Sequence, residues 1–239
     1  LAQALASAQG KGESMTAIDA VPPALRGHAS HLLARAQVLR RQDKLGEAHA
    51  LLLRLPRTAD QIADPDEFWT ERRVMIRRLL DRGDPAGAYR IAAEHGGLGP
   101  SRRAEAEFHA GWIALRYLTR PQIALAHFEE SGRVAELTAA KARADYWRGR
   151  AIEAGAYAHE TAEEAYAAAA ALPATYYGQL AAGRVGNEAL HLPATEASDM
   201  DRVMAQASPA GQLIQILLDA DLKEFAHPLA IEFARTAPS

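Results

Sequence analysis

The chain has 239 residues, of which 49% are hydrophobic and only 6% aromatic, and its formal net charge is −3. A chain of this length can bury a large core, and an alanine-rich composition with few aromatics favours many closely packed helices over a sheet. The charge gives no electrostatic basis for binding nucleic acid, and the absence of cysteine excludes disulfides and thiolate metal sites.

The first part of the chain predicts three helices. Apolar spacing indicates a short helix over residues 1–9, a longer one over 24–41 and another over 45–55. Pro56 ends the third helix because proline cannot continue a helical hydrogen-bond ladder. We therefore interpret residues 1–23 as an N-terminal helix and linker, placed before a larger domain.

The next two helix starts are marked by aspartate followed by proline. Asp64 and Asp84 can each cap a helix with a side-chain oxygen, and proline suits the first helical position because its missing N–H would be unpaired there anyway. The second of these helices is predicted to end near His95, before two glycines that are candidate C-cap residues. Ser101 then opens the central segment.

The segment from residue 105 to residue 186 contains a repeat. A shift of 38 residues superposes Phe108 on Tyr146, Gly111 on Gly149, Ala124 on Ala162, and Phe128 on Tyr166. Periods of this size are typical of helix pairs stacked into solenoids. Residues 24–186 are therefore predicted to form an all-α, TPR-like superhelical solenoid, which can bend into an arch or a ring. Carried backward, the same offset predicts a rung of Ala48, Ala86, Ala124 and Ala162, and places Tyr89 rather than Arg90 in the packing role.

Residues 187–239 do not continue the repeat and are predicted to form linker helices. They begin as a loop that contains Pro193, and three short helices follow, over 199–206, 209–220 and 228–235. The last of these is predicted to start at His227-Pro228. No apolar run in the chain approaches the roughly 18 residues that a membrane-spanning helix needs, so no transmembrane segment is predicted.

Several stretches resemble a known family. They are Phe68-Trp69 followed by Glu71-Arg72-Arg73, Gly83-Asp84-Pro85 leading to Ala88-Tyr89, Phe108 to Trp112, Tyr146 to Arg150, and Tyr176 to Ala181. In this order they resemble the superhelical (U-type) domain of the bacterial soluble lytic murein transglycosylases. The resemblance covers about residues 30–186, and the later helices would then correspond to linker helices.

That resemblance implies a periplasmic protein that works on peptidoglycan. In the family, a C-terminal lysozyme-like domain cleaves the bond between N-acetylmuramic acid and N-acetylglucosamine, with a glutamate in an E-S-x-F-type motif and a later G-L-M-Q-type motif. Here Glu13-Ser14 and Glu130-Ser131 continue differently, and no G-L-M-Q occurs. No catalytic residue can be carried over, and we expect a fragment that lacks the catalytic domain. Its implied role is to position glycan strands, with cell-wall synthesis proteins as possible further partners and no cofactor.

Candidate binding residues each have two interpretations. Trp147, with Arg143 and Arg150 on the same helix face, could stack on a sugar and pair with a peptide carboxylate, or could simply pack between helices beneath the arginine side chains. Tyr176 and Tyr177 could place a phenol in a groove, or close the helix array against the next helix.

A basic cluster forms a second candidate. Arg73 and Arg77, with Arg72 and Arg78 beside them, could meet anionic peptidoglycan or an acidic partner, or could be a solvated face paired with nearby acids. No metal site is predicted, because the only histidines at helical spacing, His28 and His31, have no third ligand in register.

Two classes of function stay open from the sequence. The first is the non-catalytic scaffold of a periplasmic lytic transglycosylase. The second is a stand-alone helical-repeat adaptor that binds protein segments in its groove. A fragment that is itself an enzyme is a third, less favoured possibility, because no complete catalytic motif is present.

Overall fold

The computed structural model describes residues 15–96, 98–186 and 198–236, and these ranges contain helices and turns but no strand. The prediction of an all-α protein is therefore confirmed. The chain divides into two compact units, Leu1–His191 and Leu192–Ser239. The helix predicted over residues 1–9, the candidate cap Gly97 and the loop predicted from 187 lie outside the described residues, except for Ser198 at the end of that loop.

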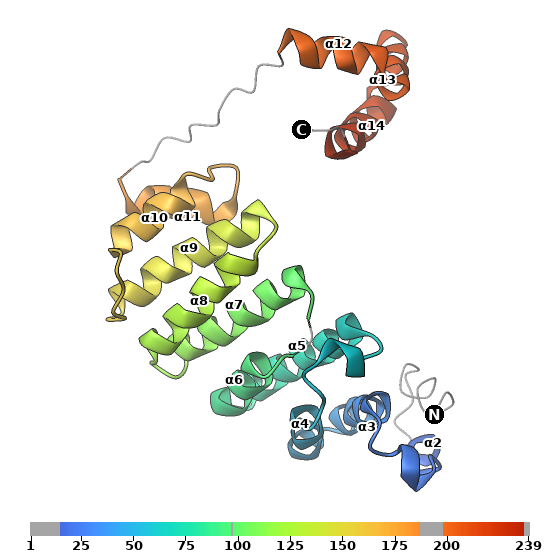
Figure 1. Ribbon diagram of the computed structural model, residues 1–239, viewed down its shortest axis with the longest axis vertical. Helices are drawn as coiled ribbons and strands as arrows, with labels where there is room; N and C mark the ends of the chain where they lie inside the picture. The colour runs from blue at the N-terminus through green and yellow to red at the C-terminus, as the bar shows by residue number, and fades with distance from the viewer. Residues whose placement is uncertain (1–14, 97, 187–197, 237–239) are drawn as a thin grey trace. The chain divides into compact units, whose positions relative to one another are not determined.

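The first unit is a row of helices that follow one another in space as they do in sequence (Figure 1). They are α2 (Thr16–Asp19), α3 (Ala29–Arg41), α4 (Leu45–Leu53), α5 (Pro65–Asp81), α6 (Pro85–Ala93), α7 (Pro100–Arg116), α8 (Pro121–Val134), α9 (Thr138–Glu153), α10 (Ala162–Ala170) and α11 (Tyr176–Arg184). Short 3₁₀ turns cover Pro23–Leu25 and Ala59–Gln61, so the helix predicted over 24–41 is divided at residues 26–28. From α3 onward, adjacent helices pack in pairs, and α3, α5, α7, α9 and α11 also contact one another in that order.

Helix starts follow the capping chemistry of the sequence. Oδ1 of Asp64 accepts a hydrogen bond from the backbone N–H of Glu67 at 3.0 Å, and Oδ1 of Asp84 accepts one from Gly87 at 2.8 Å. Each aspartate thereby satisfies one of the N–H groups that the first turn leaves unpaired. Both predicted N-caps are confirmed.

The turn inside each helix pair contains one left-handed residue. These residues are Asp43, Gly83, Thr119 and Gly155, with φ values of 60°, 75°, 55° and 98°. The residue that follows each of them returns a backbone hydrogen bond to the end of the preceding helix. This is the usual way to satisfy the last carbonyls of a helix while reversing the chain. The same local turn thus generates all four described pairs.

The spacing of the pairs is less regular than the sequence predicts. The second helices of the four pairs begin at residues 45, 85, 121 and 162, and the intervals are therefore 40, 36 and 41 residues. The alanine rung with a constant offset of 38 is wrong at Ala86, which is exposed, because the buried alanine of α6 is Ala88. The substitution of Tyr89 for Arg90 is confirmed, because Tyr89 packs against the core and Arg90 is exposed.

A continuous core runs through the row of helices. Tyr89 and Trp112 pack against both the cluster centred on α3 to α7 and the cluster centred on α7 to α9. Trp147 in turn joins the second cluster to the one formed by α9, α10 and α11. Aromatic side chains therefore connect successive helix pairs, although few aromatics are present.

Arg72 is buried, in contrast to its predicted place in an exposed basic cluster. Only 2% of its surface is accessible, and its two terminal nitrogens donate to the carbonyl oxygens of Leu52 (3.0 Å) and Ile91 (3.3 Å). These carbonyls belong to the last turns of α4 and α6, where helices leave acceptors unpaired and the helix dipole is negative. Burial lowers the pKa of Arg72 to about 10. Arg72 therefore joins two helix ends and contributes nothing to a surface patch.

Its neighbour Glu71 is also buried and lies beside Arg40 of α3. Oε1 and Oε2 of Glu71 accept from Nε and Nη2 of Arg40 at 2.5 and 3.1 Å. Burial raises the pKa of Glu71, and the hydrogen bonds and charge of Arg40 oppose that rise. Glu71 and Arg72 thus connect α5 to α3, α4 and α6.

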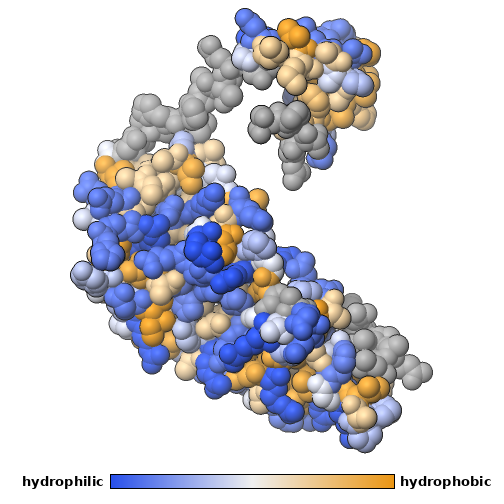
Figure 2. Space-filling view, viewed as in Figure 1, coloured by the Kyte–Doolittle hydropathy of each residue, from blue (hydrophilic) through white to orange (hydrophobic). Residues whose placement is uncertain are grey.

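The second unit is a small group of three helices, α12 (Asp199–Ala207), α13 (Pro209–Asp219) and α14 (Lys223–Thr236). The predicted start of the last helix at His227-Pro228 is wrong, because α14 begins at Lys223, two residues after a left-handed residue, Asp221 (φ 59°). Pro228 lies inside α14, where it has no N–H to donate to the helical ladder. Many apolar side chains of this unit face solvent, and Figure 2 shows hydrophobic residues on its visible surface.

Candidate functional site

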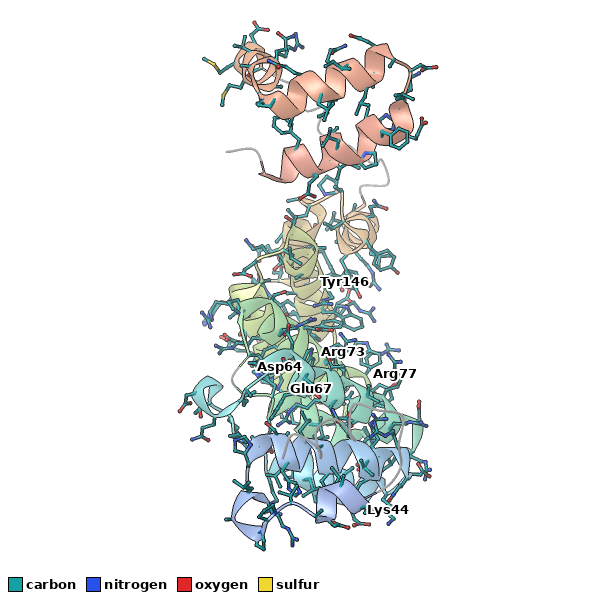
Figure 3. The ribbon with its side chains drawn as sticks, turned by 90° about the vertical axis from the view of Figure 1, so that its right-hand side faces the viewer. Lys44, Asp64, Glu67, Arg73, Arg77 and Tyr146 are labelled. Atoms are coloured by element: carbon teal, nitrogen blue, oxygen red, sulfur yellow. The ribbon has the colours of Figure 1, made fainter. Side chains whose placement is uncertain are left out.

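Two hollows lie along the first helices of the successive pairs. The first, the Arg77 hollow, has a volume of about 450 Å³ and is lined by Arg73, Ile76, Arg77, Leu80, Asp81, Glu105, His109, Trp112 and Tyr117. The second, the Arg143 hollow, has a volume of about 370 Å³ and is lined by Ser101, Glu105, Leu137, Ala139, Ala140, Arg143, Tyr176 and Tyr177. Glu105 of α7 lines both, so the two hollows adjoin. Figure 3 shows the predicted residues Arg73 and Arg77 beside each other on α5.

Glu105 is held in place by α5. Its Oε2 accepts a hydrogen bond from Nε1 of Trp69 at 2.8 Å, and its Oε1 pairs with Nη1 of Arg73 at 2.8 Å. Burial favours the neutral acid, but the Trp69 hydrogen bond and the Arg73 charge outweigh it and lower the pKa of Glu105. The carboxylate is therefore ionised and fixed at the boundary of the two hollows.

His109 lies one helical turn after Glu105 and also faces the Arg77 hollow. Its Nδ1 is 2.8 Å from the carbonyl oxygen of Glu105 and, because a carbonyl can only accept, Nδ1 carries the proton. Burial lowers the pKa of His109, which makes the neutral ring the dominant form near neutral pH. In that tautomer Nε2 is a hydrogen-bond acceptor. The His109 ring itself packs edge to face against the rings of Trp69 and Phe108.

The far side of the Arg77 hollow is aromatic. Trp112 and Tyr117 meet edge to face with ring centroids 5.3 Å apart, and Tyr117 is 47% exposed. Arg77 is exposed and forms no ion pair within the described ranges, whereas Arg73 is already paired with Glu105. The hollow thus combines an aromatic wall, a free guanidinium and a carboxylate, which together can bind a polar ligand with flat apolar faces.

The Arg143 hollow is more apolar. The Cζ atom of Arg143 lies 4.0 Å from the centroid of the Phe108 ring, in a cation–π contact. Tyr177 packs against Tyr146 and meets Tyr176 edge to face at 5.1 Å. The ring of Tyr176 itself is 69% exposed. Arg143, Tyr176 and Tyr177, which the sequence placed in two separate candidates, therefore line one hollow.

The other two predicted residues lie outside both hollows. Trp147 is half-buried and its ring lies 6.2, 5.9 and 5.9 Å from the rings of Phe108, Phe128 and Tyr146. Arg150 lies over Trp147 at 5.7 Å and donates to the Tyr146 hydroxyl at 3.4 Å. This is the geometry of packing between helices, the alternative that the sequence left open for Trp147.

Only Arg73 and Arg77 of this hollow were singled out from the sequence as binding candidates, and four residues of α7 and the turn after it were missed. They are Glu105, His109, Trp112 and Tyr117. A signal for three of them was present, because Glu105, His109 and Trp112 are spaced i, i+4 and i+7 and therefore share one helix face. The α5–α7 crossing that places Arg73 against this face has no local sequence signal.

A separate polar chain connects α6, α7 and α8. Glu107 accepts from Nε2 of His95 at 3.0 Å and from Nδ1 of His127 at 2.6 Å, and Nε2 of His127 lies 2.9 Å from the Tyr89 hydroxyl. Burial opposes ionisation of Glu107, but the two histidine hydrogen bonds outweigh it and lower its pKa to about 2. None of the four residues lines either hollow. Across the described part of the chain, no group of three or more candidate ligands has a geometry that could hold a metal ion.

The described residues form an all-α protein, and the Arg77 hollow and the Arg143 hollow adjoin on the surface of its first unit. Comparison of the chain with protein-family models, with curated proteins and with solved structures finds no match. Among the described residues, no helix is both long enough and apolar enough to span a membrane.

Proposed function

We propose that this chain is the non-catalytic helical scaffold of a periplasmic lytic transglycosylase, and that its helix pairs stack as a TPR-like superhelix. In this role it binds peptidoglycan glycan strands and presents them to a lysozyme-like catalytic domain. Support comes from the order of motifs in the sequence and from the repeated contacts among α3, α5, α7, α9 and α11.

The observation that carries the proposal is the composition of the Arg77 hollow. Sugars offer apolar ring faces to aromatic side chains and hydroxyl groups to planar hydrogen-bonding groups. Trp112 and Tyr117 supply the aromatic wall, and the neutral His109 and ionised Glu105 supply acceptors. Arg77 adds a cation suited to the acidic groups of a peptidoglycan strand.

Binding of soluble, peptide-free glycan strands to the purified chain tests the proposal. Tyr117→Ala and Arg77→Gln change exposed residues of the hollow, and each is expected to weaken binding about three- to tenfold, the range of a single aromatic or ionic contact. Tyr157→Ala is the matched control, because Tyr157 is an exposed aromatic outside both hollows. Absence of binding by the unmodified chain, or an equal loss in the Tyr157 variant, contradicts the proposal.

A stand-alone adaptor for protein segments is the second candidate. It is favoured by the exposed apolar side chains of the second unit, which suit contacts with another protein more than contacts with a glycan. The coding sequence after Ser239 discriminates between the two candidates. A continuation with E-S-x-F and G-L-M-Q motifs supports the scaffold, and a stop codon or an unrelated domain supports the adaptor.

A further inference from the structure

We propose that the Arg143 hollow is a carboxylate subsite, which binds the free C-terminal carboxylate of a short peptide next to a small apolar side chain. This inference rests on the proposed function, in which the bound polymer carries peptides, and it assigns a ligand class to the second hollow.

The guanidinium of Arg143 lacks a counter-ion. In the ranges that the structure describes, Arg143 takes part in no ion pair, and its buried Nε atom has no hydrogen-bond partner. The neighbouring carboxylate of Glu105 is occupied by Trp69 and Arg73. An arginine remains charged in a protein, and a partly buried charge without a partner is costly. A ligand carboxylate that accepts from Arg143 removes that cost.

The charge of the hollow selects the kind of anion. A single free cation faces it, and the ionised Glu105 carboxylate lines the same space. A dianionic phosphate would meet repulsion from Glu105 that one guanidinium offsets poorly, whereas a monoanionic carboxylate matches the guanidinium in charge and in its planar geometry.

The rim of the hollow selects what lies next to the carboxylate. Leu137 is 63% exposed, and Ala139, Ala140 and the ring of Tyr176 complete an apolar border. The hydroxyl groups of Ser101 and Tyr177 also line the hollow and can donate a second hydrogen bond to a carboxylate. In about 370 Å³ these groups fit a terminal residue with a small apolar side chain better than a bulky or charged one.

The test is a calorimetric or NMR titration of the intact chain with N-acetyl-alanyl-alanine, compared with the same dipeptide as its C-terminal amide. The acid is expected to bind at least about tenfold more tightly than the amide, because a hydrogen bond to a charged group is lost in the amide. Equal affinity of acid and amide, or no binding of either, overturns the inference without the use of any variant.

Variants then locate the site. Arg143→Gln is expected to remove the preference for the acid and Arg143→Lys to restore part of it. Arg78→Gln, at an exposed position outside both hollows, is expected to leave the preference unchanged. Leu137→Asp adds a negative charge at an exposed helix N-cap, where aspartate supports folding, and is expected to weaken acid binding about fivefold. It therefore keeps the test decisive if Arg143→Gln fails to fold. An unchanged acid preference in Leu137→Asp places the binding elsewhere and overturns the inference.

The two proposals can fail separately. If peptide-free glycan binds but the dipeptide acid does not, the carboxylate subsite is wrong and the glycan scaffold stands. If the dipeptide acid binds through Arg143 and the glycan does not, the subsite stands and the glycan-binding role is wrong.

Discussion

The ring of Tyr166 on α10 fills the space that a side chain at Gly149 on α9 would need. A Cβ atom at residue 149 would lie 2.7 Å from Cε1 of Tyr166, closer than carbon atoms pack. The preceding helix pair repeats this contact, because a Cβ at Gly111 would lie 2.7 Å from Cε1 of Phe128. The glycine and the ring are therefore two halves of one packing unit, and they recur 38 residues apart.

We predict that Gly149→Ala lowers the free energy of unfolding by roughly 1–3 kcal/mol, the usual cost of overpacking. The Tyr166 ring is buried, and three of its carbon atoms lie within 3.0 Å of the Cβ position, so the ring or the helix must shift to admit the methyl group. Alanine would gain up to about 1 kcal/mol of helix propensity, which is smaller than the expected steric cost. Urea unfolding followed by circular dichroism measures the difference.

Gly183→Ala in α11 is the matched control, because a Cβ there meets nothing within 4 Å. It is expected to stabilise the chain by about 0.5–1 kcal/mol, the opposite sign. If both alanine variants change stability in the same direction, the contact between Gly149 and the Tyr166 ring does not explain the glycine at this position.

The sequence could predict this packing unit because both halves of it are residue types with a clear steric meaning. It could also predict the caps at Asp64 and Asp84, since capping depends on neighbours a few residues away. The exact spacing of the pairs could not be predicted, because the connecting turns differ in length while the turn motif stays the same. The burial of Arg72 could not be predicted either, since its acceptors come from helices about 20 residues before and after it.

The second prediction concerns Arg72. Arg72→Met should lower the free energy of unfolding by about 1–3 kcal/mol, because it removes the guanidinium hydrogen bonds to the buried carbonyls of Leu52 and Ile91. Arg72→Lys should restore little of the lost stability, since a single ammonium nitrogen cannot reach both carbonyl oxygens as the two terminal nitrogens of the guanidinium do. Arg78→Gln, on an exposed position of the same helix, should stay within about 0.5 kcal/mol of the unmodified chain. Comparable losses at positions 72 and 78 would contradict the bridging role.

The third prediction concerns acid stability. The pKa of Glu107 is lowered from 4.5 to about 2 in the folded chain, and so its ionised form stabilises the fold above the unfolded pKa. This contribution, at most about 3 kcal/mol, is lost as the pH falls from about 4.5 to about 2. Glu107→Gln should be less stable at pH 7 and should show a shallower loss over this window. Unfolding free energies that run parallel for the two proteins between pH 5 and 2.5 would show that Glu107 does not contribute.

The candidate site was predicted in part. Arg73, Arg77, Arg143, Tyr176 and Tyr177 were identified from charge and aromatic pattern, and all five line one of the two hollows. Their grouping could not be read from the sequence, because it depends on how α5, α7, α9 and α11 pack. A tryptophan flanked by arginines has the same pattern whether the ring faces solvent or lies between helices.

The last prediction separates these two roles for an aromatic side chain. Trp147 bridges two parts of the core, and Trp147→Ala should lower the free energy of unfolding by about 3–5 kcal/mol. Tyr176 is mostly exposed, and Tyr176→Ala should change stability by less than about 0.5 kcal/mol while weakening binding of the dipeptide acid, because it removes part of the apolar rim. Unfolding curves and titrations on the same two variants measure both effects, and Trp147→Phe keeps enough of the ring for binding to be measured on folded protein. If Trp147→Phe weakens ligand binding more than Tyr176→Ala does, the tryptophan contacts the ligand, and the assignment of the hollow to Arg143, Tyr176 and Tyr177 is wrong.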